Sequence, residues 1–110
     1  MTMTQEIAAR LREHIAMDPR ITERKMFGGI GFMLNGNMAL GATSKGALMV
    51  RLGKNNDAAA RALPGADHVD FAAKRMGGFL VVPNDAVEAD DHLRGWIDLA
   101  MAFTASLPPK

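Results

Sequence analysis

The chain has 110 residues, no cysteine and a formal net charge of +1 at pH 7. The lack of cysteine excludes disulfides, thiol nucleophiles and cysteine-ligated zinc. The small net charge is unlike the strongly basic balance of a dedicated nucleic-acid binder. The hydrophobic share of 48% is typical of one globular domain, and no apolar run is long enough to cross a bilayer. Because the first residues also lack the basic and hydrophobic regions of a signal peptide, we expect one cytoplasmic domain over residues 1–110.

An amphipathic helix opens the chain. Thr2 and Gln5 fit a capping box, and apolar residues then recur at every fourth position. Asp18 is pushed out of the helical region because it precedes Pro19. The pattern predicts a helix over residues 3–17.

Three strand-like runs and two tight turns follow. Asn35 and Gly36 separate two apolar runs, and this pair readily takes the two positive φ angles of a type I′ hairpin turn. A second turn over residues 44–46 leads to a run in which Leu48 and Val50 share one face. The pattern predicts an antiparallel meander, with residues 25–27 as a poorly patterned lead-in strand.

Glycines and methionines are dense in this meander. Gly28, Gly29 and Gly31 indicate a strand corner, with a ligand-cradling loop as the alternative. The methionines lie in strand runs, where core filling is the commoner use of this flexible side chain. We therefore expect the core to take up Met26, Met33, Met38 and Met49.

The second half of the chain alternates short and long elements. Asn56 can cap a short helix over residues 57–63, and alternation predicts strands over residues 69–71 and 79–82. The last helix follows acidic residues that suit its positive N-terminal end and carries the only tryptophan, Trp96, on its apolar face. The predicted class is α+β, a two-layer sandwich of an antiparallel sheet of about five to six strands with N- and C-terminal helices.

No catalytic set is recognisable. The histidines His14, His68 and His92 fall in separate elements, without a metal-ligand interval between them. The acidic pair Asp90 and Asp91 is explained by the helix dipole. The sequence therefore indicates neither an enzyme nor a bound metal or cofactor.

Two short segments repeat a basic pair, a methionine and a glycine pair. Each segment opens a strand, so the basic pairs could meet at one rim of the sheet and, with Arg51, attract an anion or an acidic partner. The alternative is two solvated strand starts. The candidate contact residues are Arg24, Lys25, Arg51, Lys74 and Arg75, and the accompanying motif positions are Met26, Phe27, Gly28, Gly29, Met76, Gly77, Gly78 and Trp96.

The order of these motifs resembles the N-terminal domain of the TfoX (Sxy) competence regulators over nearly the whole chain. The residues that carry the resemblance are Arg24-x-Met26-Phe27-Gly28-Gly29, Asn35-Gly36, Leu48-x-x-Arg51-Leu52, Met76-Gly77-Gly78-Phe79-x-x-Val82-Pro83 and Leu93-x-x-Trp96-x-x-x-Ala100. The resemblance implies a fold similar to secretion-chaperone-like domains and a role in competence-gene transcription together with the cyclic-AMP receptor protein. It implies no enzymatic activity and no cofactor. Full regulators of this kind carry a second, helical domain, so we expect a stand-alone N-terminal domain.

Two functional hypotheses of different classes follow. The first is a non-enzymatic regulatory protein that acts through macromolecular contacts, with a protein partner favoured over DNA. The alternative is a small-molecule-binding domain or an unrecognised enzyme that uses the glycine-rich corner. We also expect a homodimer, because a meander leaves a sheet edge or face to be covered.

Overall fold

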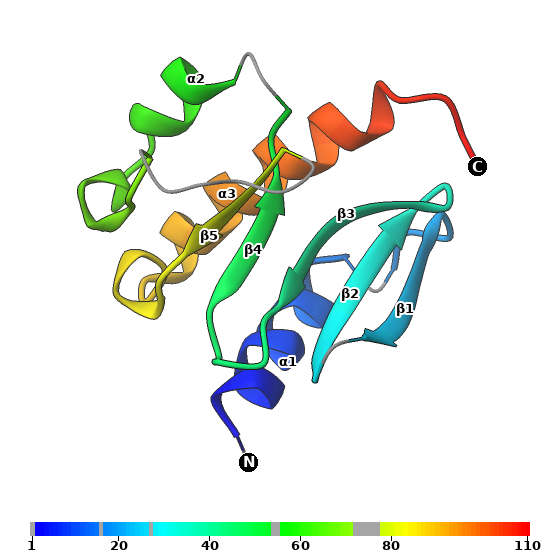
Figure 1. The fold of residues 1–110 in the computed structure, drawn as a ribbon, viewed down its shortest axis with the longest axis horizontal. Helices are drawn as coiled ribbons and strands as arrows, with labels where there is room; N and C mark the ends of the chain where they lie inside the picture. Colours follow the sequence, from blue (N-terminus) through cyan, green and yellow to red (C-terminus); the bar gives the residue numbers. More distant parts are fainter. Residues whose placement is uncertain (1, 16, 27, 54–55, 72–77) are drawn as a thin grey trace.

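Figure 1 shows the computed structural model, which describes residues 2–15, 17–26, 28–53, 56–71 and 78–110. All strand pairs are antiparallel, and strands that follow one another in the chain are neighbours in the sheet, in the order β1-β2-β3-β4-β5. This confirms the predicted α+β class with a five-stranded sheet. The elements are α1 (Met3–Ile15), β1 (Ile21–Met26), β2 (Gly29–Leu34), β3 (Asn37–Ala42), β4 (Leu48–Arg51), α2 (Asp57–Arg61), η1 (Ala66–His68), β5 (Phe79–Val82), η2 (Asn84–Ala86) and α3 (Asp90–Ala105).

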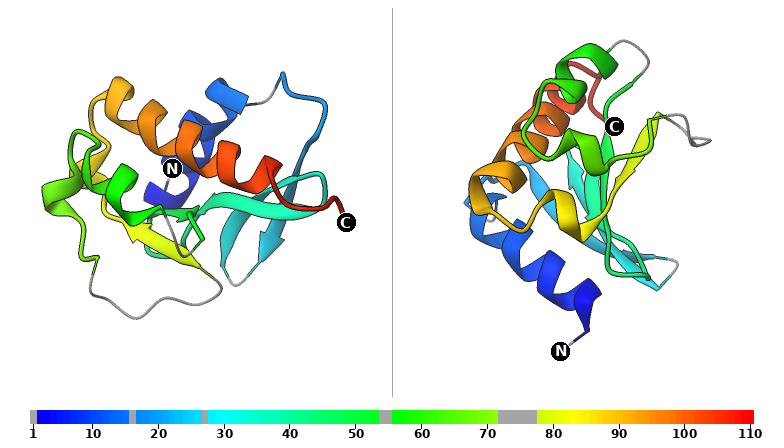
Figure 2. Two further views of the ribbon diagram at one scale, coloured as in Figure 1. Left: turned by 90° about the horizontal axis from the view of Figure 1, so that it is seen from above. Right: turned by 90° about the vertical axis from the view of Figure 1, so that its left-hand side faces the viewer.

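The helices α1 and α3 lie on the same face of the sheet, behind it in Figure 1, and the two turned views of Figure 2 show this layer from the side. We call the covered face the inner face and the opposite one the outer face. No described helix covers the outer face (Figure 2). The molecule therefore has one helical layer and one sheet layer.

The core lies between the helices and the inner face. Apolar side chains that alternate along the strands meet the apolar stripes of both helices. Trp96 is the largest fully buried side chain. The other fully buried large side chains are Phe32, Leu11, Leu34, Leu40, Leu48, Leu52, Leu80, Leu93, Val50, Val82 and Val87.

The predicted capping box is present at the start of α1. The Thr2 N–H donates to Gln5 Oε1, and the Gln5 N–H donates to Thr2 Oγ1, both at 3.1 Å. The helix ends at Ile15, two positions before the predicted end, and the Asp18 N–H bonds to the Ile15 carbonyl at 3.1 Å.

Both predicted turns of the meander are confirmed. Asn35 has φ of 53° and Gly36 has φ of 85°, as a two-residue type I′ hairpin requires. In the second turn, Thr43 Oγ1 accepts the N–H groups of Lys45 and Ala47. These local bonds fix how β2, β3 and β4 follow one another.

Three predictions for local structure are wrong. The first strand begins at Ile21 rather than at residue 25, because pairing with β2 extends a run that the sequence pattern marks weakly. Residues 69–71 form no strand: Val69 packs into the core, and Arg61 lies 4.4 Å above the Phe71 ring, so their apolar groups are covered without a ladder. Asn56 occupies the N-cap position of α2 but makes no side-chain capping hydrogen bond; its Nδ2 instead donates to the Leu52 carbonyl at 2.7 Å.

The last helix follows the prediction closely. It begins at Asp90 and Asp91, whose negative charge suits its N-terminal end. The Gly95 position is crowded, because a Cβ there would lie 3.0 Å from Leu63 Cδ2. Leu63 thus packs closely against a glycine that lowers helix stability by about 1 kcal/mol against alanine.

Candidate protein-docking face

One row of directly opposed residues crosses all five strands on the outer face. It runs from β1 to β5 through Arg24, Gly31, Gly41, Met49 and Val81. The pleat sends the residues on either side of each of these positions to the inner face. The row therefore fixes which side chains the sheet turns away from the helices.

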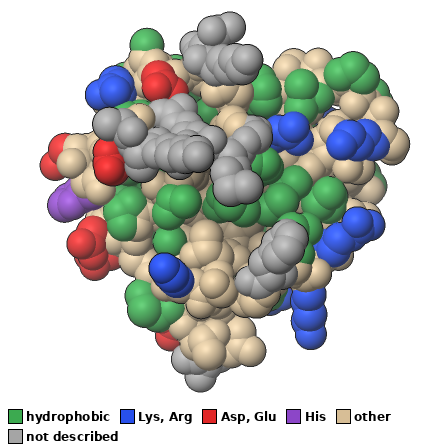
Figure 3. Space-filling model, viewed as in Figure 1, with side chains coloured by type: hydrophobic (Ala, Val, Ile, Leu, Met, Phe, Trp, Pro, Cys, Tyr) green, Lys and Arg blue, Asp and Glu red, His purple; other side chains and the backbone are tan. Residues whose placement is uncertain are grey.

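The outer face is defined by this row and by the positions that share its side. It carries arginine, methionine, valine and phenylalanine, and no acidic side chain among the described positions. In Figure 3, hydrophobic side chains gather over the middle of this face, with Lys and Arg side chains near its margins. The positions are Thr22, Arg24, Met26, Gly29, Gly31, Met33, Met38, Gly41, Met49, Arg51, Phe79 and Val81.

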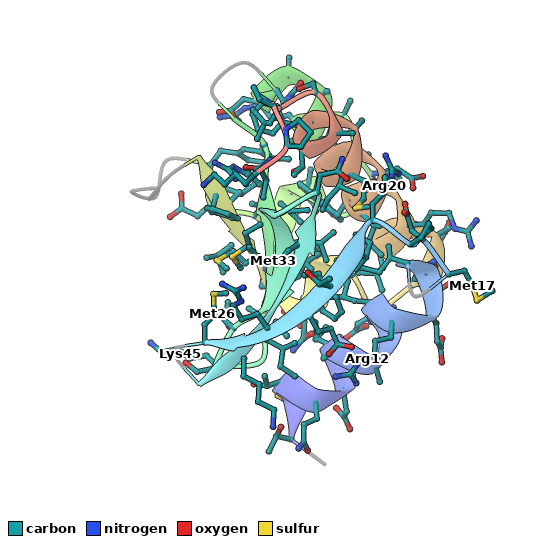
Figure 4. The ribbon with its side chains drawn as sticks, turned by 90° about the vertical axis from the view of Figure 1, so that its right-hand side faces the viewer. Arg12, Met17, Arg20, Met26, Met33 and Lys45 are labelled. Carbon is teal, nitrogen blue, oxygen red and sulfur yellow. The ribbon has the colours of Figure 1, made fainter. Side chains whose placement is uncertain are left out.

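The expectation that the methionines fill the core is wrong. Met26, Met33, Met38 and Met49 are all half-buried and lie outside the buried core. Their alternation with buried neighbours such as Val50 was the sequence signal for an outward position. Figure 4 shows Met26 and Met33 projecting from the side of the sheet opposite to Arg12.

A bulge in β3 helps to place these side chains. Phe32 opposes Leu40 while Met33 opposes Met38, so Ala39 is an extra residue in the ladder. Ala39 and Leu40 are both fully buried. The register shift thus keeps Met38 on the outer face.

The glycines of β2 and β3 form a buried strip with no side chains of its own, between and beneath the methionines. We call this strip, over Gly29, Gly31 and Gly41 and bordered by Met26, Met38 and Met49, the methionine trough. A Cβ on Gly31 would lie 3.0 Å from Met26 Cε and 3.2 Å from Met38 Cε, so the ends of these side chains lie above the glycine. A cavity of about 220 Å³ opens beside them, and its lining includes all three methionines.

Two predicted contact residues lie on the outer face, on different strands. Arg51 of β4 donates from Nη1 to the Met38 carbonyl at 3.2 Å and lies 5.4 Å from the centre of the Phe79 ring. Arg24 of β1 is exposed. Because neighbouring strands lie about 4.8 Å apart, roughly 14 Å of sheet separates β1 from β4.

Lys25 points to the other side of the sheet from Arg24. With Thr2, Gln5 and Gly28 it lines a cavity of about 350 Å³ at the glycine corner. Lys25 is the one titratable side chain among the described residues of that lining. Gly29, which also lines it, packs so close to β3 that a Cβ would meet the Ala42 carbonyl oxygen. Gly29 therefore packs against the protein's own backbone, as the strand-corner interpretation predicts, while Gly28 lies against the Ser44 side chain and Gly31 against methionine side chains.

Several motif positions lie outside the described residues, namely Phe27, Lys74, Arg75, Met76 and Gly77. The predicted meeting of the two basic pairs therefore stays a prediction. Gly78 is described: it has φ of 81°, and its carbonyl accepts the Leu52 N–H at 3.1 Å. Trp96 belongs to the core, where its Nε1 has no hydrogen-bond partner among the described atoms.

The helical side of the molecule carries most of the described ion pairs. Arg12 on α1 holds Glu23 of β1 with two hydrogen bonds of 2.7 and 2.8 Å, and these bonds lower the pKa of Glu23. His14 Nε2 lies 3.1 Å from Asp90 Oδ1. Beside them, a cavity of about 290 Å³ between α1 and α3 has a mixed acidic and basic lining.

The described residues contain neither a metal-binding group of side chains nor a helix that could cross a membrane. No group of three histidine, cysteine, aspartate or glutamate side chains is placed to hold a metal ion. No described helix is both long and apolar enough to cross a membrane.

The fold and the outer face define a small α+β domain whose sheet has one face packed on helices and one face uncovered by them. Residues 13–104 match the family model of the TfoX N-terminal domain, so the chain belongs to that family. Comparisons with curated proteins and with solved structures return no match.

Proposed function

We propose that this chain is a non-enzymatic, cytoplasmic regulatory domain that acts by binding another protein through its outer face. One observation carries the proposal: the row across the five strands combines methionine and valine with an arginine and no acidic residue. Val81 in that row is 54% exposed. Contiguous exposed apolar surface with a polar margin is typical of protein interaction sites.

The methionines suit this role because they are unbranched and flexible. Thioether side chains repack around differently shaped partners and are frequent on adaptable binding surfaces. The resemblance to the TfoX (Sxy) regulators implies a role in competence-gene transcription together with the cyclic-AMP receptor protein. We therefore place the proposed partner among proteins that control transcription.

A protein partner is favoured over duplex DNA. Arg24 and Arg51 stand on β1 and β4, and Arg51 already donates to Met38 and lies beside Phe79. The net charge of +1 gives little long-range attraction for phosphates. Burying the apolar centre of the outer face is more favourable against a protein surface than against a phosphate backbone.

A homodimer is a separate proposal, and it concerns the sheet edge. Among the described strands β1 pairs with β2 alone, so its other edge offers backbone groups to a second copy. Light scattering at tens of micromolar is expected to give the dimer mass. A monomer mass would reject this proposal and leave the outer face unaffected.

The test of the proposed function is a comparative pull-down from cell extract with two matched variants. Val81→Lys puts a charge on the outer face, and Met17→Lys puts the same charge at a position that is 95% exposed and lies outside the sheet. Proteins recovered by the wild type should be depleted by about tenfold with Val81→Lys and unchanged with Met17→Lys. Equal recovery with all three proteins would contradict the proposal.

A further inference from the structure

We propose that the partner presents a bulky apolar side chain to the methionine trough and carries acidic residues beside it that contact Arg24. This inference rests on the proposed function, because it names the chemistry of the segment that the outer face binds. It goes beyond that function by assigning separate roles to the trough and to the arginine. The trough holds the bulky apolar side chain of the partner, which we call the anchor. Arg24 selects for acidic residues beside that anchor.

The size of the trough favours a single side chain. Its cavity of about 220 Å³ is smaller than the roughly 300–1,000 Å³ of typical small-molecule sites. The Cε atoms of Met26 and Met38 lie over Gly31, and each methionine can move its end by rotating about flexible bonds. An entering aromatic or aliphatic side chain can therefore displace these ends and contact the glycine backbone beneath them.

The charge of Arg24 is available on the outer face because its acidic neighbour points elsewhere. Glu23 lies on the inner side of β1, where Arg12 holds it at 2.7 Å. No acidic residue occupies a described position of the outer face. A guanidinium pairs well with a carboxylate because its N–H groups match both oxygens. Complementarity therefore favours a partner segment with aspartate or glutamate next to its apolar anchor.

The same charges disfavour a second copy of this chain as the occupant of the outer face. Both copies would contribute arginines, and neither would contribute a carboxylate from the described strand positions of this face to pair with them. Like charges at an interface are unfavourable. The occupant is thus a segment of different composition, whereas a homodimer would use the β1 edge.

A displayed library of short random peptides, selected on the whole chain, tests this inference. The enriched peptides should share a bulky apolar residue with aspartate or glutamate beside it. Labelled copies should bind about tenfold more weakly to Gly31→Val, which fills the trough, and to Arg24→Glu, which reverses the charge. Arg94→Glu, an exposed arginine on α3, is the matched control and should leave affinity within about twofold.

The outcomes distinguish failure of this inference from failure of the proposed function. One group of outcomes concerns peptides that bind the Val81→Lys variant more weakly than the wild type. If these peptides lack acidic residues, or bind Gly31→Val as well as the wild type, the inference is overturned and the proposed function stands. A selection that yields no peptide sensitive to Val81→Lys would contradict the proposed function itself. Unfolding curves followed by Trp96 fluorescence establish that each variant is folded, and Arg24→Glu keeps the test decisive should Gly31→Val fail to fold.

Discussion

Gly31 and Gly41 face each other across β2 and β3, yet the atoms that an added methyl group would meet differ between the two positions. At Gly31 a Cβ meets only the movable ends of Met26 and Met38, at 3.0 and 3.2 Å. At Gly41 it would lie 2.6 Å from the Ile30 carbonyl oxygen, which belongs to the paired backbone. The trough is therefore adjustable over Gly31 and rigid over Gly41.

Matched alanine substitutions test this difference. Gly31→Ala should leave the free energy of unfolding unchanged or raise it by up to about 1 kcal/mol, because alanine restricts the unfolded chain. Gly41→Ala should lower it by roughly 1–3 kcal/mol, because β2 or β3 must shift. Urea unfolding followed by the fluorescence of Trp96, the only tryptophan in a chain without tyrosine, measures both. Equal stability of the two variants would contradict the described packing.

Asp18 gives a prediction for the dependence of stability on pH. Its carboxylate accepts the Arg20 backbone N–H at 2.9 Å and two guanidinium bonds at 3.0 and 2.7 Å, and the guanidinium bonds above all lower the pKa of Asp18 to about 2. A carboxyl group whose pKa is lower in the folded state stabilises the fold above its unfolded pKa of about 3.9. This contribution is lost as the pH falls toward the folded value of about 2.

Asp18→Asn should therefore lower the urea midpoint at neutral pH. The difference from the wild type should narrow as the pH falls from about 4 toward about 2. Asp85→Asn, at another exposed carboxylate, is the control. A difference that persists unchanged in acid would show that the charge of Asp18 is not its cause.

At the scale of the element, β1 is an edge strand of the described sheet that a side-chain ion pair joins to α1. It has one neighbouring strand, and its residues from Thr22 to Lys25 are exposed. The pair of Arg12 and Glu23 joins it to α1, but both side chains are about two-fifths exposed, at 43% and 41%. Such an exposed pair contributes at most about 1 kcal/mol. Its effect should be local order in β1 rather than global stability.

Glu23→Gln tests this by hydrogen exchange. The substitution removes the charge, so the β1 amides should exchange faster by up to about fivefold while those of β4 stay unchanged. Arg94→Gln, on the other helix, is the matched control. Faster exchange throughout the sheet would mean that the ion pair stabilises the whole fold.

The sequence was informative at the first hairpin and at the start of α1, where a local rule decides the structure, but not for the side-chain cap expected of Asn56. Asn35 and Gly36 fix a hairpin through their own backbone preferences, and Thr2 with Gln5 fix a helix start. The strand assigned to residues 69–71 failed because alternation cannot tell a strand from an irregular segment whose apolar groups are covered by Arg61 and the core. The sequence signals for helices and hairpins are local, whereas a strand forms only when it pairs with another strand.

The outer face was only partly predictable for the same reason. Arg24 and Arg51 were candidate contacts from the sequence, but the methionines were assigned to the core. Which side of a sheet is inner depends on where α1 and α3 pack and on the bulge at Ala39. Composition gives no information on either. The row from Arg24 to Val81 could be recognised only once the register of the five strands was known.

At the scale of the whole molecule, weak binding to duplex DNA is expected. Four phosphate contacts would give a log-log salt slope of about −3.6, at roughly −0.9 for each contact. A net charge of +1 supplies little attraction to begin with. Titration of labelled duplex at low and moderate salt measures this. Tight, salt-sensitive binding that a double variant, Lys74→Ala with Arg75→Ala, removes would make the basic segments a nucleic-acid site.

Site-specific photo-crosslinking in cells tests whether the outer face of the sheet binds a protein partner. A photoreactive amino acid in place of Met33 stands on the outer face, and the same residue in place of Met17 stands outside the sheet. We expect a discrete crosslinked protein from position 33 that is absent from position 17 and is lost when Val81→Lys is added. The same crosslinked proteins from both positions, or none from position 33, would contradict the proposed function.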